Sequence, residues 1–308
     1  MRILVLGAGA LGGYFGGRLL EAGADVSFLV RPRRARELAE HGLVVRSPFG
    51  DIQRPVPILK SGEAEGAFDL ALLTCKAYDL DDAMAAIAPL LAADGAVLPL
   101  LNGLAHLDRL DAAFGAGRVL GGTAHISATL GERGAILHLN DLHRITFGER
   151  DGAVSARCEA LAAAFARSKV ESRFSNHIMQ EMWEKMAFLA SLAALTCLMR
   201  ASVGDIAATA EGRAVAEELY AEIQAVAAAW GHPPRPPAVK QALTLMTQPG
   251  SSFVASMLRD IERGGPTEGD HIVGDLLRRA RAKDLPTPLL RLANCHLQAY
   301  EQRRAHGG

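Results

Sequence analysis

Residues 3–12 read Ile-Leu-Val-Leu-Gly-Ala-Gly-Ala-Leu-Gly, a short apolar run followed by the spacing G-x-G-x-x-G. The run predicts a buried strand, and the residues from Leu11 to Glu21 predict a helix directly after the glycines. In such a loop, Gly7 makes a tight turn, Gly9 lets backbone N–H groups approach a pyrophosphate, and Gly12 lets the helix pack closely on the strand. The positive end of the helix dipole also favours an anion there. The residues predicted to bind a dinucleotide are Gly7, Ala8, Gly9, Ala10, Leu11 and Gly12.

Arg31 directly follows the second predicted strand, Asp25–Val30. At this place, a site for NAD has an acidic residue that binds the ribose 2′-hydroxyl. A guanidinium instead pairs with the 2′-phosphate of NADP through charge-assisted hydrogen bonds. We therefore predict NADP(H) as the cofactor and Arg31 as the residue that binds its 2′-phosphate. The nearby Arg33, Arg34 and Arg36 also fit a solvated helix face.

The composition describes a globular chain without a nucleic-acid partner. Of the 308 residues, 49% are hydrophobic and 22% are charged, which excludes the disordered and collagen-like classes. Since 33 Lys and Arg face 34 Asp and Glu, the chain lacks the excess of positive charge that binding to a phosphate backbone needs. We expect no nucleic acid among its partners.

The cysteines and the longest apolar run suggest a reducing, aqueous environment. The four cysteines are Cys75, Cys158, Cys197 and Cys295. Because they lie far apart and form no C-x-x-C pair, they encode neither a disulfide framework nor a zinc site. The apolar run Met186–Met199 is shorter than the about 20 residues that span a bilayer. We expect a buried core helix there, a cytoplasmic location and no membrane partner.

The first half of the chain alternates strand-like and helix-like segments, which is typical of a parallel, doubly wound sheet. Residues 43–46 and 52–59 predict a hairpin near the edge of this sheet, and residues 119–149 predict an antiparallel extension of it. Beyond residue 175 only helical patterns remain. We therefore predict the α/β class, with an N-terminal Rossmann-type NADP-binding domain (1–175) and an all-α C-terminal domain (176–308). The helices predicted there cover about 176–199, 211–230, 237–248, 251–263, 268–283 and 287–302.

Polar residues at the carboxyl ends of parallel strands are candidates for a ligand site, since open α/β sheets bind ligands there. Lys76 and Asn102 each follow a predicted strand in this way, although surface loop residues can occupy the same places. Lys185 stands beside a nearly continuous apolar run, where it either extends to water or serves a site. Glu268 is either a partner carboxylate or an ordinary acid at a helix N-terminus.

Four further residues have side chains that could take part in chemistry. His138, Asp141 and His143 lie near a predicted strand turn, but their spacing fits no common zinc pattern. We therefore predict no metal site. His125 follows a strand that could approach the active site, and the sequence assigns it no role.

The whole chain resembles the ketopantoate reductase (2-dehydropantoate 2-reductase) family. This family combines an N-terminal Rossmann domain with a C-terminal helical domain and reduces a 2-oxo acid with NADPH. The matching motifs span residues 1 to about 283 in the same order and spacing. They are Ile3–Gly12, Arg31, Thr74-Cys75-Lys76-Ala77, Leu101-Asn102-Gly103, Met182–Ala187, Ser256–Asp260 and Thr267-Glu268.

The resemblance implies a role for each candidate. Lys185 matches the catalytic lysine and Glu268 its acidic partner. Lys76 and Asn102 match residues that contact the cofactor and substrate near the nicotinamide, and Ser256 matches a substrate-binding serine. These roles agree with the chemistry, because hydride transfer to a ketone carbon leaves negative charge on the oxygen, which an ammonium stabilises and protonates.

One departure from the family pattern concerns the substrate. Asparagines typically follow the family's lysine by four and eight residues, whereas this chain has Leu189 and Ala193 there. Since residues 185, 189 and 193 share one helix face, the surface beyond Lys185 is apolar. This change predicts poor use of hydroxylated ketopantoate, or other polar groups in place of the asparagines.

Three functions follow from these observations. The first is NADPH-dependent reduction of ketopantoate or a related 2-oxo acid, as in pantothenate biosynthesis, and the second is reduction of a more apolar 2-oxo acid. The third is an NADP-binding sensor without turnover, but a sensor has no use for a proton donor such as Lys185 or for its partner Glu268. The Ala- and Leu-rich helices suit either a homodimer interface or an internal core.

Overall fold

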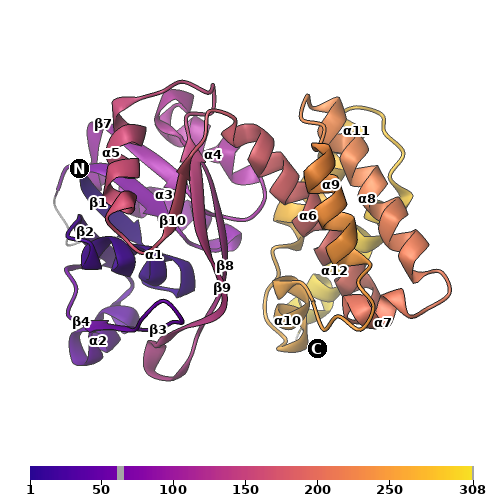
Figure 1. The fold of residues 1–308 in the computed structure, drawn as a ribbon, viewed down its shortest axis with the longest axis horizontal. Helices are drawn as coiled ribbons and strands as arrows, with labels where there is room; N and C mark the ends of the chain where they lie inside the picture. The colour runs from indigo at the N-terminus through magenta and orange to yellow at the C-terminus, as the bar shows by residue number, and fades with distance from the viewer. Residues whose placement is uncertain (61–65, 307–308) are drawn as a thin grey trace. The chain divides into compact units, whose positions relative to one another are not determined.

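The computed structural model describes residues 1–60 and 66–306, which form two compact units. The first unit contains Met1–Leu101 and His106–Ile178, and the second contains Asn102–Ala105 and Met179–Gly308. The strands lie in the first unit, and the second contains the long helices α6 (Ile178–Met199, from its second residue on), α8 (Gly212–Ala229) and α12 (Pro288–Ala305) (Figure 1).

The first unit is built on a five-stranded parallel sheet with the order β5-β2-β1-β6-β7. Its strands are β1 (Arg2–Leu6), β2 (Asp25–Val30), β5 (Ile58–Lys60), β6 (Phe68–Leu73) and β7 (Leu91–Pro99). The chain runs outward from β1 to β2 and later returns to β6 on the other side. The end of β1 is therefore the switch point at which doubly wound sheets bind ligands. The Rossmann-type sheet expected from the sequence is confirmed.

A second sheet has the order β10-β9-β3-β4, with β8 paired antiparallel to β9. Its strands are β3 (Leu43–Arg46), β4 (Ile52–Arg54), β8 (Gly121–Leu130), β9 (Ile136–Gly148) and β10 (Glu171–Phe174). The prediction that residues 119–149 extend the first sheet was wrong, because β9 pairs with β3, β8 and β10 instead. An isolated bridge between Val97 and Val119 links the two sheets.

The predicted hairpin at residues 43–59 is only half formed. Strands β3 and β4 pair antiparallel, as expected, but β5 leaves the hairpin and pairs in parallel with β2 in the first sheet. Pro55 and Pro57 lie between β4 and β5. Since proline has no N–H to donate to a ladder, these residues end the hairpin after Arg54. The Pro57 carbonyl then accepts the Phe28 N–H at 2.9 Å and directs the chain toward β2.

Helix α1 (Ala10–Glu21) packs between the two sheets, against β1 and β2 on one side and β3, β8 and β9 on the other. Glycines on both sides make this close packing feasible. A Cβ on Gly16 would come within 2.8 Å of the Phe28 ring, and one on Gly17 within 2.7 Å of Leu43. The other α-helices before residue 178 are α2 (Pro32–His41), α3 (Leu80–Ile87), α4 (Ala105–Phe114) and α5 (Ala156–Ala166).

The rest of the chain is helical. Its elements are α6 (Ile178–Met199), α7 (Val203–Ala207), α8 (Gly212–Ala229), α9 (Pro236–Met246), α10 (Ser256–Glu262), the π-helical turn η5 (Asp270–Gly274), α11 (Asp275–Arg281) and α12 (Pro288–Ala305). Helix α6 has the length and hydropathy of a membrane span, but 67% of its most apolar window is buried inside the protein. It is therefore the core helix expected from the sequence.

Helix α10 is shorter than the predicted helix at 251–263, because the segment before it pairs with the start of α7 instead of forming a helix. The Ser251 carbonyl accepts the Gly204 N–H at 2.8 Å, and the Phe253 carbonyl accepts the Val203 N–H at 3.0 Å. These bonds satisfy N–H groups at the start of α7, which lack partners within that helix. The periodicity of residues 251–255 carries no sign of this pairing with a distant segment.

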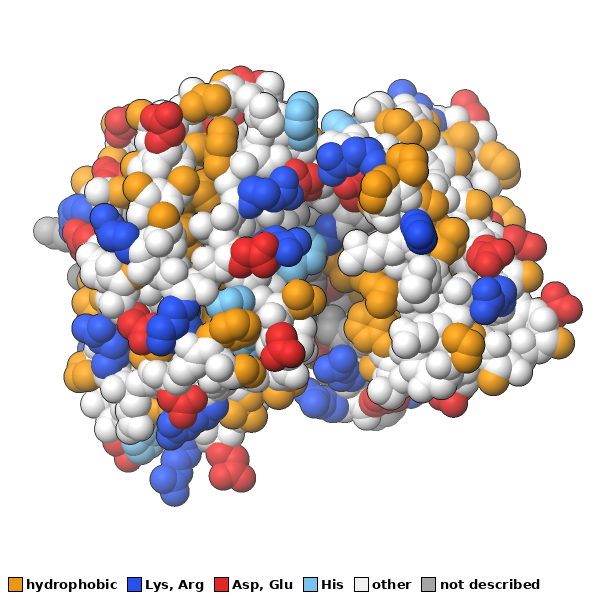
Figure 2. Space-filling model, viewed as in Figure 1, with side chains coloured by type: hydrophobic (Ala, Val, Ile, Leu, Met, Phe, Trp, Pro, Cys, Tyr) orange, Lys and Arg blue, Asp and Glu red, His pale blue; other side chains and the backbone are white. Residues whose placement is uncertain are grey.

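Basic and acidic side chains are intermixed on the face of the molecule shown in Figure 2. Exposed ion pairs in the protein include Arg144 with Glu171 at 2.7 Å and Arg278 with Asp270 at 2.8 Å. Such pairs contribute little stability each, about 0–1 kcal/mol. They place opposite charges side by side, in keeping with the nearly equal numbers of basic (33) and acidic (34) residues.

Candidate active site

The predicted cofactor loop joins the end of β1 to the start of α1. Gly7 has a φ of 88°, in the left-handed region that favours glycine, and its N–H donates to the Leu29 carbonyl at 2.9 Å. Gly9 is the N-cap of α1, and no described atom lies within 4 Å of the place of its missing Cβ. Ala10 and Leu11 begin the first turn. The loop thus presents bare backbone at a helix N-terminus, the arrangement that suits a pyrophosphate.

Gly12 lies where helix and strands meet most closely. A Cβ on Gly12 would collide with the Gly7 carbonyl oxygen and with Oγ1 of Thr74. Thr74 follows β6 and donates its hydroxyl to the Leu6 carbonyl at 2.8 Å, so it is held firmly in this position. From the sequence alone, Thr74 belongs to a family motif but has no predicted role. Its contact shows that the residue supports the turn on which the glycine loop rests.

Arg31 is the N-cap residue of α2, directly beyond β2. Its Nη2 donates to Oδ1 of Asp79 at 2.7 Å, and this hydrogen bond and the charge of Asp79 raise the pKa of Arg31. The side chain is 68% exposed. An exposed guanidinium held by one carboxylate can exchange that partner for a phosphate.

Arg34 lies one turn further along α2 and has a different environment. Its Nε donates to the Ala8 carbonyl at 3.0 Å, and its Nη1 donates to Oε2 of Glu37 at 3.0 Å. Only 14% of the Arg34 side chain is exposed. Sequence reasoning missed this residue, because a run of arginines does not indicate which of them meets the glycine loop.

Lys76 and Asn102 follow strands whose ends are in register. Leu6 pairs with Leu73 between β1 and β6, and Leu73 pairs with Pro99 between β6 and β7. Lys76 lies three residues after Leu73, and Asn102 lies three residues after Pro99. Both therefore extend from the carboxyl edge of the sheet, where the glycine loop also begins. Both residues are half-buried.

Lys185 lies in the second turn of α6 and is half-buried. Burial lowers its pKa from the ordinary 10.5 to about 8. The adjacent Glu184 accepts two hydrogen bonds from the Arg235 guanidinium, at 2.7 and 2.6 Å, and one from Gln180 at 3.1 Å. These bonds tie α6 to the start of α9 and so fix the helix that carries Lys185.

Leu189 and Ala193 follow Lys185 by one and two helical turns. Leu189 is half-buried, whereas Ala193 is 4% exposed and belongs to the core. Of these two positions, position 189 therefore has the greater side-chain surface on the lysine face. Any effect on ligand choice falls mainly on Leu189.

Glu268 is 7% exposed and lies between α10 and η5. The preceding Thr267 donates both its N–H and its hydroxyl to Oε1 of Glu301 on α12, each at 2.7 Å. The π-helical turn η5 begins two residues after Glu268, and such turns occur frequently at functional sites. The backbone before Glu268 is thus held by hydrogen bonds to Glu301, and the backbone after it enters a π-helical turn. The sequence did not reveal the contact with Glu301, because 34 residues separate the partners.

The three residues predicted in the helical part come from three separate segments of the chain. Lys185 lies on α6, Glu268 precedes η5, and Ser256 is the first residue of α10, where it is exposed. His125, whose role the sequence left open, lies on β8 and is exposed.

The two histidines of β9 belong to an aromatic cluster around α1. The Tyr14 hydroxyl forms a 2.8 Å hydrogen bond with Nδ1 of His143, and the Ser47 hydroxyl forms one of 2.9 Å with Nδ1 of His138. The Phe49 ring stacks on His143 with 3.6 Å between centroids. Across residues 1–60 and 66–306, no group of three or more His, Cys, Asp or Glu residues is arranged to hold a metal ion.

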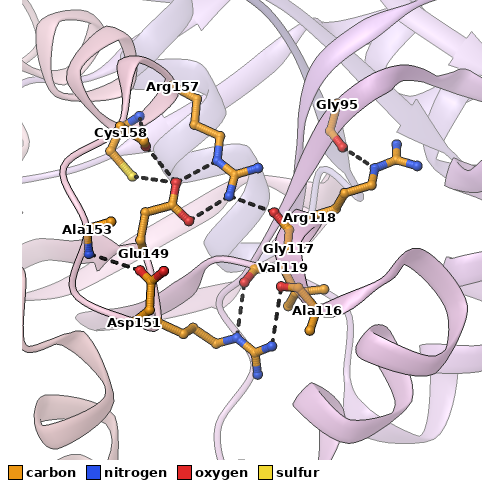
Figure 3. A network of polar contacts seen from close by, with 12 residues as sticks. Gly95, Ala116, Gly117, Arg118, Val119, Glu149, Asp151, Ala153, Arg157 and Cys158 are labelled. Carbon is orange, nitrogen blue, oxygen red and sulfur yellow. Dashed lines mark hydrogen bonds and ion pairs between the residues drawn. The ribbon is translucent and has the colours of Figure 1, made fainter.

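An ion pair between the buried Glu149 and the half-buried Arg157 follows β9 in the first unit. Arg157 donates from Nε and Nη2 to the two carboxylate oxygens of Glu149 at 2.6 Å, and from Nη2 to the Gly117 carbonyl at 2.8 Å (Figure 3). The Ser155 hydroxyl donates to Glu149 as well, at 2.6 Å. Burial raises the pKa of Glu149, but the bonds from Arg157 and Ser155 outweigh it and lower the pKa. The pair joins β9, α5 and the turn at Gly117.

Models of one family match most of the chain. The model described as ketopantoate reductase PanE/ApbA matches residues 3–152. The model of the C-terminal part of ketopantoate reductase PanE/ApbA matches residues 177–301.

Individual relatives match over their whole length. An uncharacterized oxidoreductase, YkpB of Bacillus subtilis (strain 168), is 39% identical over 99% of this chain and 100% of its own. A 2-dehydropantoate 2-reductase of Mesorhizobium japonicum is 28% identical over 94% of each chain. The crystal structure of 2-dehydropantoate 2-reductase from Geobacter metallireducens GS-15 is 31% identical, with a TM-score of 0.88 over 97% of this chain and 99% of that one.

Proposed function

The chain belongs to the ketopantoate reductase PanE/ApbA family, and we propose that it reduces ketopantoate (2-dehydropantoate) or a related 2-oxo acid to the 2-hydroxy acid. As a member of this family it is an NADP-dependent oxidoreductase that acts on CH–OH groups. The observation that carries the proposal is Lys185, a half-buried lysine whose pKa burial lowers to about 8.

The residues at the carboxyl ends of β1, β2, β6 and β7 fit the cofactor. The N–H groups at the start of α1 would hold the pyrophosphate, since Gly9 leaves the backbone uncovered, and Arg31 would bind the 2′-phosphate. Lys76 and Asn102, at the carboxyl edge of the sheet, would orient the nicotinamide end and the substrate. When bound, NADPH supplies a hydride to the ketone carbon.

Lys185 would act as the general acid. Negative charge develops on the ketone oxygen as the hydride arrives, and the ammonium stabilises this charge and then gives up its proton to form the hydroxyl. A pKa near 8 suits this role, because the lysine is still protonated at pH 7 but is a stronger acid than an ordinary lysine.

Glu268 and Ser256 would complete the site. The Glu268 carboxylate would hold the Lys185 ammonium in place or accept a hydrogen bond from a substrate hydroxyl, and Ser256 would bind the substrate. The support for Glu268 is its burial, together with the hydrogen bonds from Thr267 to Glu301 that fix the preceding backbone.

A more apolar 2-oxo acid is the second candidate for the substrate. The observation that favours it is Leu189, which follows Lys185 by one turn and has no donor or acceptor for a substrate hydroxyl. A hydroxylated acid would lose a hydrogen bond at this position, whereas an aliphatic one would lose nothing.

The test is a panel of 2-oxo acids assayed with NADPH and with NADH. It should include ketopantoate and its apolar counterpart without the hydroxyl, 3,3-dimethyl-2-oxobutanoate, with wild type and Leu189→Asn side by side. We expect NADPH to be preferred and Leu189→Asn to raise kcat/KM for ketopantoate relative to the apolar acid. If no 2-oxo acid is reduced although NADPH binds, the protein is a sensor and the proposal is wrong.

A role in pantothenate biosynthesis, a cytoplasmic location and a homodimer stay predictions. The first depends on ketopantoate being the preferred acid in the panel. Light scattering at several protein concentrations would measure the oligomeric state.

A further inference from the structure

Arg34 and Arg31 lie three residues apart at the start of α2, but the structure holds them differently. Arg31 is 68% exposed, and its guanidinium donates a hydrogen bond to Asp79. Arg34 is 14% exposed and contacts the Ala8 carbonyl inside the glycine loop. A guanidinium that meets a backbone carbonyl of a cofactor loop acts on the loop itself, whereas an exposed one acts on what the loop binds.

The Arg34 side chain is enclosed on its far side as well. A Cβ on Gly134, in the turn between β8 and β9, would run into the Arg34 guanidinium and come within 2.7 Å of Oε2 of Glu37. Glu37 accepts a hydrogen bond from Nη1 of Arg34 at 3.0 Å. Arg34 is therefore clamped between the glycine loop and this turn, and it cannot swing out to a ligand without breaking both contacts.

Within the glycine loop, the Ala8 carbonyl accepts a hydrogen bond from a side chain, that of Arg34. Backbone hydrogen bonds hold the loop on either side, from the Gly7 N–H to Leu29 and from the Gly13 N–H to the Gly9 carbonyl. Arg34 secures the residue between them, where the chain turns from strand to helix. The orientation of the Ala8 peptide also sets the direction of the following Gly9 N–H, because the peptide unit is planar.

One nitrogen of Arg34, Nη2, is buried and has no hydrogen-bond partner among the described residues. Leaving a buried donor unsatisfied costs stability, and such a group in a native fold calls for a functional explanation. If the only role of residue 34 were to fill space, an apolar residue would serve as well and would leave no buried donor unsatisfied.

We propose that Arg34 is a positioning residue of the cofactor loop, which holds the Ala8 peptide so that the loop N–H groups face the pyrophosphate, while Arg31 alone distinguishes NADPH from NADH. Since the pyrophosphate is common to both dinucleotides, Arg34 supports the binding of both equally. The inference does not depend on Lys185 or on the identity of the substrate.

The experiment measures the dissociation constants of NADPH and NADH by calorimetry for wild type, Arg34→Met, Arg31→Met and Arg36→Met. Methionine keeps the aliphatic stem, and Arg36, an exposed residue of the same helix, is the matched control for loss of a positive charge. Arg34→Met should weaken both dinucleotides by about the same factor, roughly tenfold, as expected for one charge-assisted hydrogen bond. Arg31→Met should weaken NADPH alone, and Arg36→Met should change neither by more than about twofold.

A second readout needs no ligand. Hydrogen exchange of the amides of residues 7–13 should be faster in the cofactor-free Arg34→Met protein than in wild type and unchanged in Arg36→Met. The inference is overturned if Arg34→Met weakens NADPH only, which would make Arg34 a second reader of the 2′-phosphate, or if it leaves both dinucleotides unaffected. Should Arg34→Met not fold, Gly134→Ala, which displaces the guanidinium from the other side, decides by the same criterion.

Discussion

Glu149 in the first unit and Lys185 in the second both hold a charge away from water, but their surroundings act in opposite ways. The pKa of Glu149 is lowered because Arg157 and Ser155 donate to its carboxylate, and the acid therefore stays charged. The pKa of Lys185 is lowered to about 8 by burial, which favours its neutral form. Hydrogen-bond donors thus keep Glu149 charged, whereas burial brings Lys185, the proposed proton donor, close to its titration point.

Replacing Lys185 tests the catalytic side of this contrast most strongly. Lys185→Ala should lower kcat by about 10³-fold, since a positioned general acid contributes 10²–10⁴. Lys185→Arg should be similarly impaired, because a guanidinium keeps the charge but does not release a proton. Steady-state kinetics give kcat, and calorimetry should show that NADPH binding changes little. Undiminished turnover in Lys185→Ala would remove the lysine from the mechanism.

Replacing Glu149 tests the structural side. Glu149→Ala leaves the half-buried Arg157 without its carboxylate and should lower the free energy of unfolding by about 2 kcal/mol, with little change in kcat per folded molecule. Urea denaturation measures the loss. Asp51→Asn, which weakens the exposed pair of Asp51 with Arg46, is the matched control and should leave the midpoint unchanged. Equal losses from the two variants would contradict the distinction.

The pH dependence sharpens the contrast further. Because Lys185 must be protonated to act as an acid, kcat/KM for reduction should fall about tenfold per pH unit above pH 8. The lysine's pKa in the folded protein lies below its ordinary 10.5, so its contribution to stability should increase between pH 8 and 10.5. Initial rates from pH 6 to 10 test the first point. A profile without a break near pH 8 would mean that another group donates the proton.

The smallest effect is expected at His143. Burial, together with the charges of His138 and Arg18, lowers its pKa below 6.5, and Glu171 opposes them. The fold therefore favours neutral His143, and its contribution to stability is complete above pH 6.5 and is lost as the pH falls below that value. The free energy of unfolding should thus decrease slightly from pH 7 to 5 because of this residue.

His143→Gln isolates that contribution. The variant should have a smaller difference between its urea midpoints at pH 7 and pH 5 than wild type. His306→Gln, at an exposed position near the C-terminus, should retain the wild-type difference. The expectation fails if both variants behave alike.

The sequence predicts those parts of the molecule in which neighbouring residues act together. Gly7, Gly9 and Gly12 form one local motif, so the turn, the N-cap and the close helix contact could all be inferred from it. The position of Arg31 at the end of β2 could also be predicted, because the residue directly follows the predicted strand in the sequence.

Features that depend on distant partners were missed. The contact of Arg34 with Ala8 spans 26 residues, and that of Thr267 with Glu301 spans 34. The second sheet was missed for the same reason. Alternation identifies β9 as a strand, but it does not indicate that β3 and β10 are its parallel partners.

The exposure of Arg31 has a consequence for redesign and for evolution. If this one side chain reads the 2′-phosphate, coenzyme preference is controlled at the surface, where a substitution repacks nothing. Gly12, by contrast, touches two strand ends and tolerates no added atom. A lineage or a protein engineer can therefore exchange one nicotinamide coenzyme for the other by altering Arg31 at the start of α2, while Arg34 and the glycine loop, which hold the shared part of the coenzyme, stay unchanged.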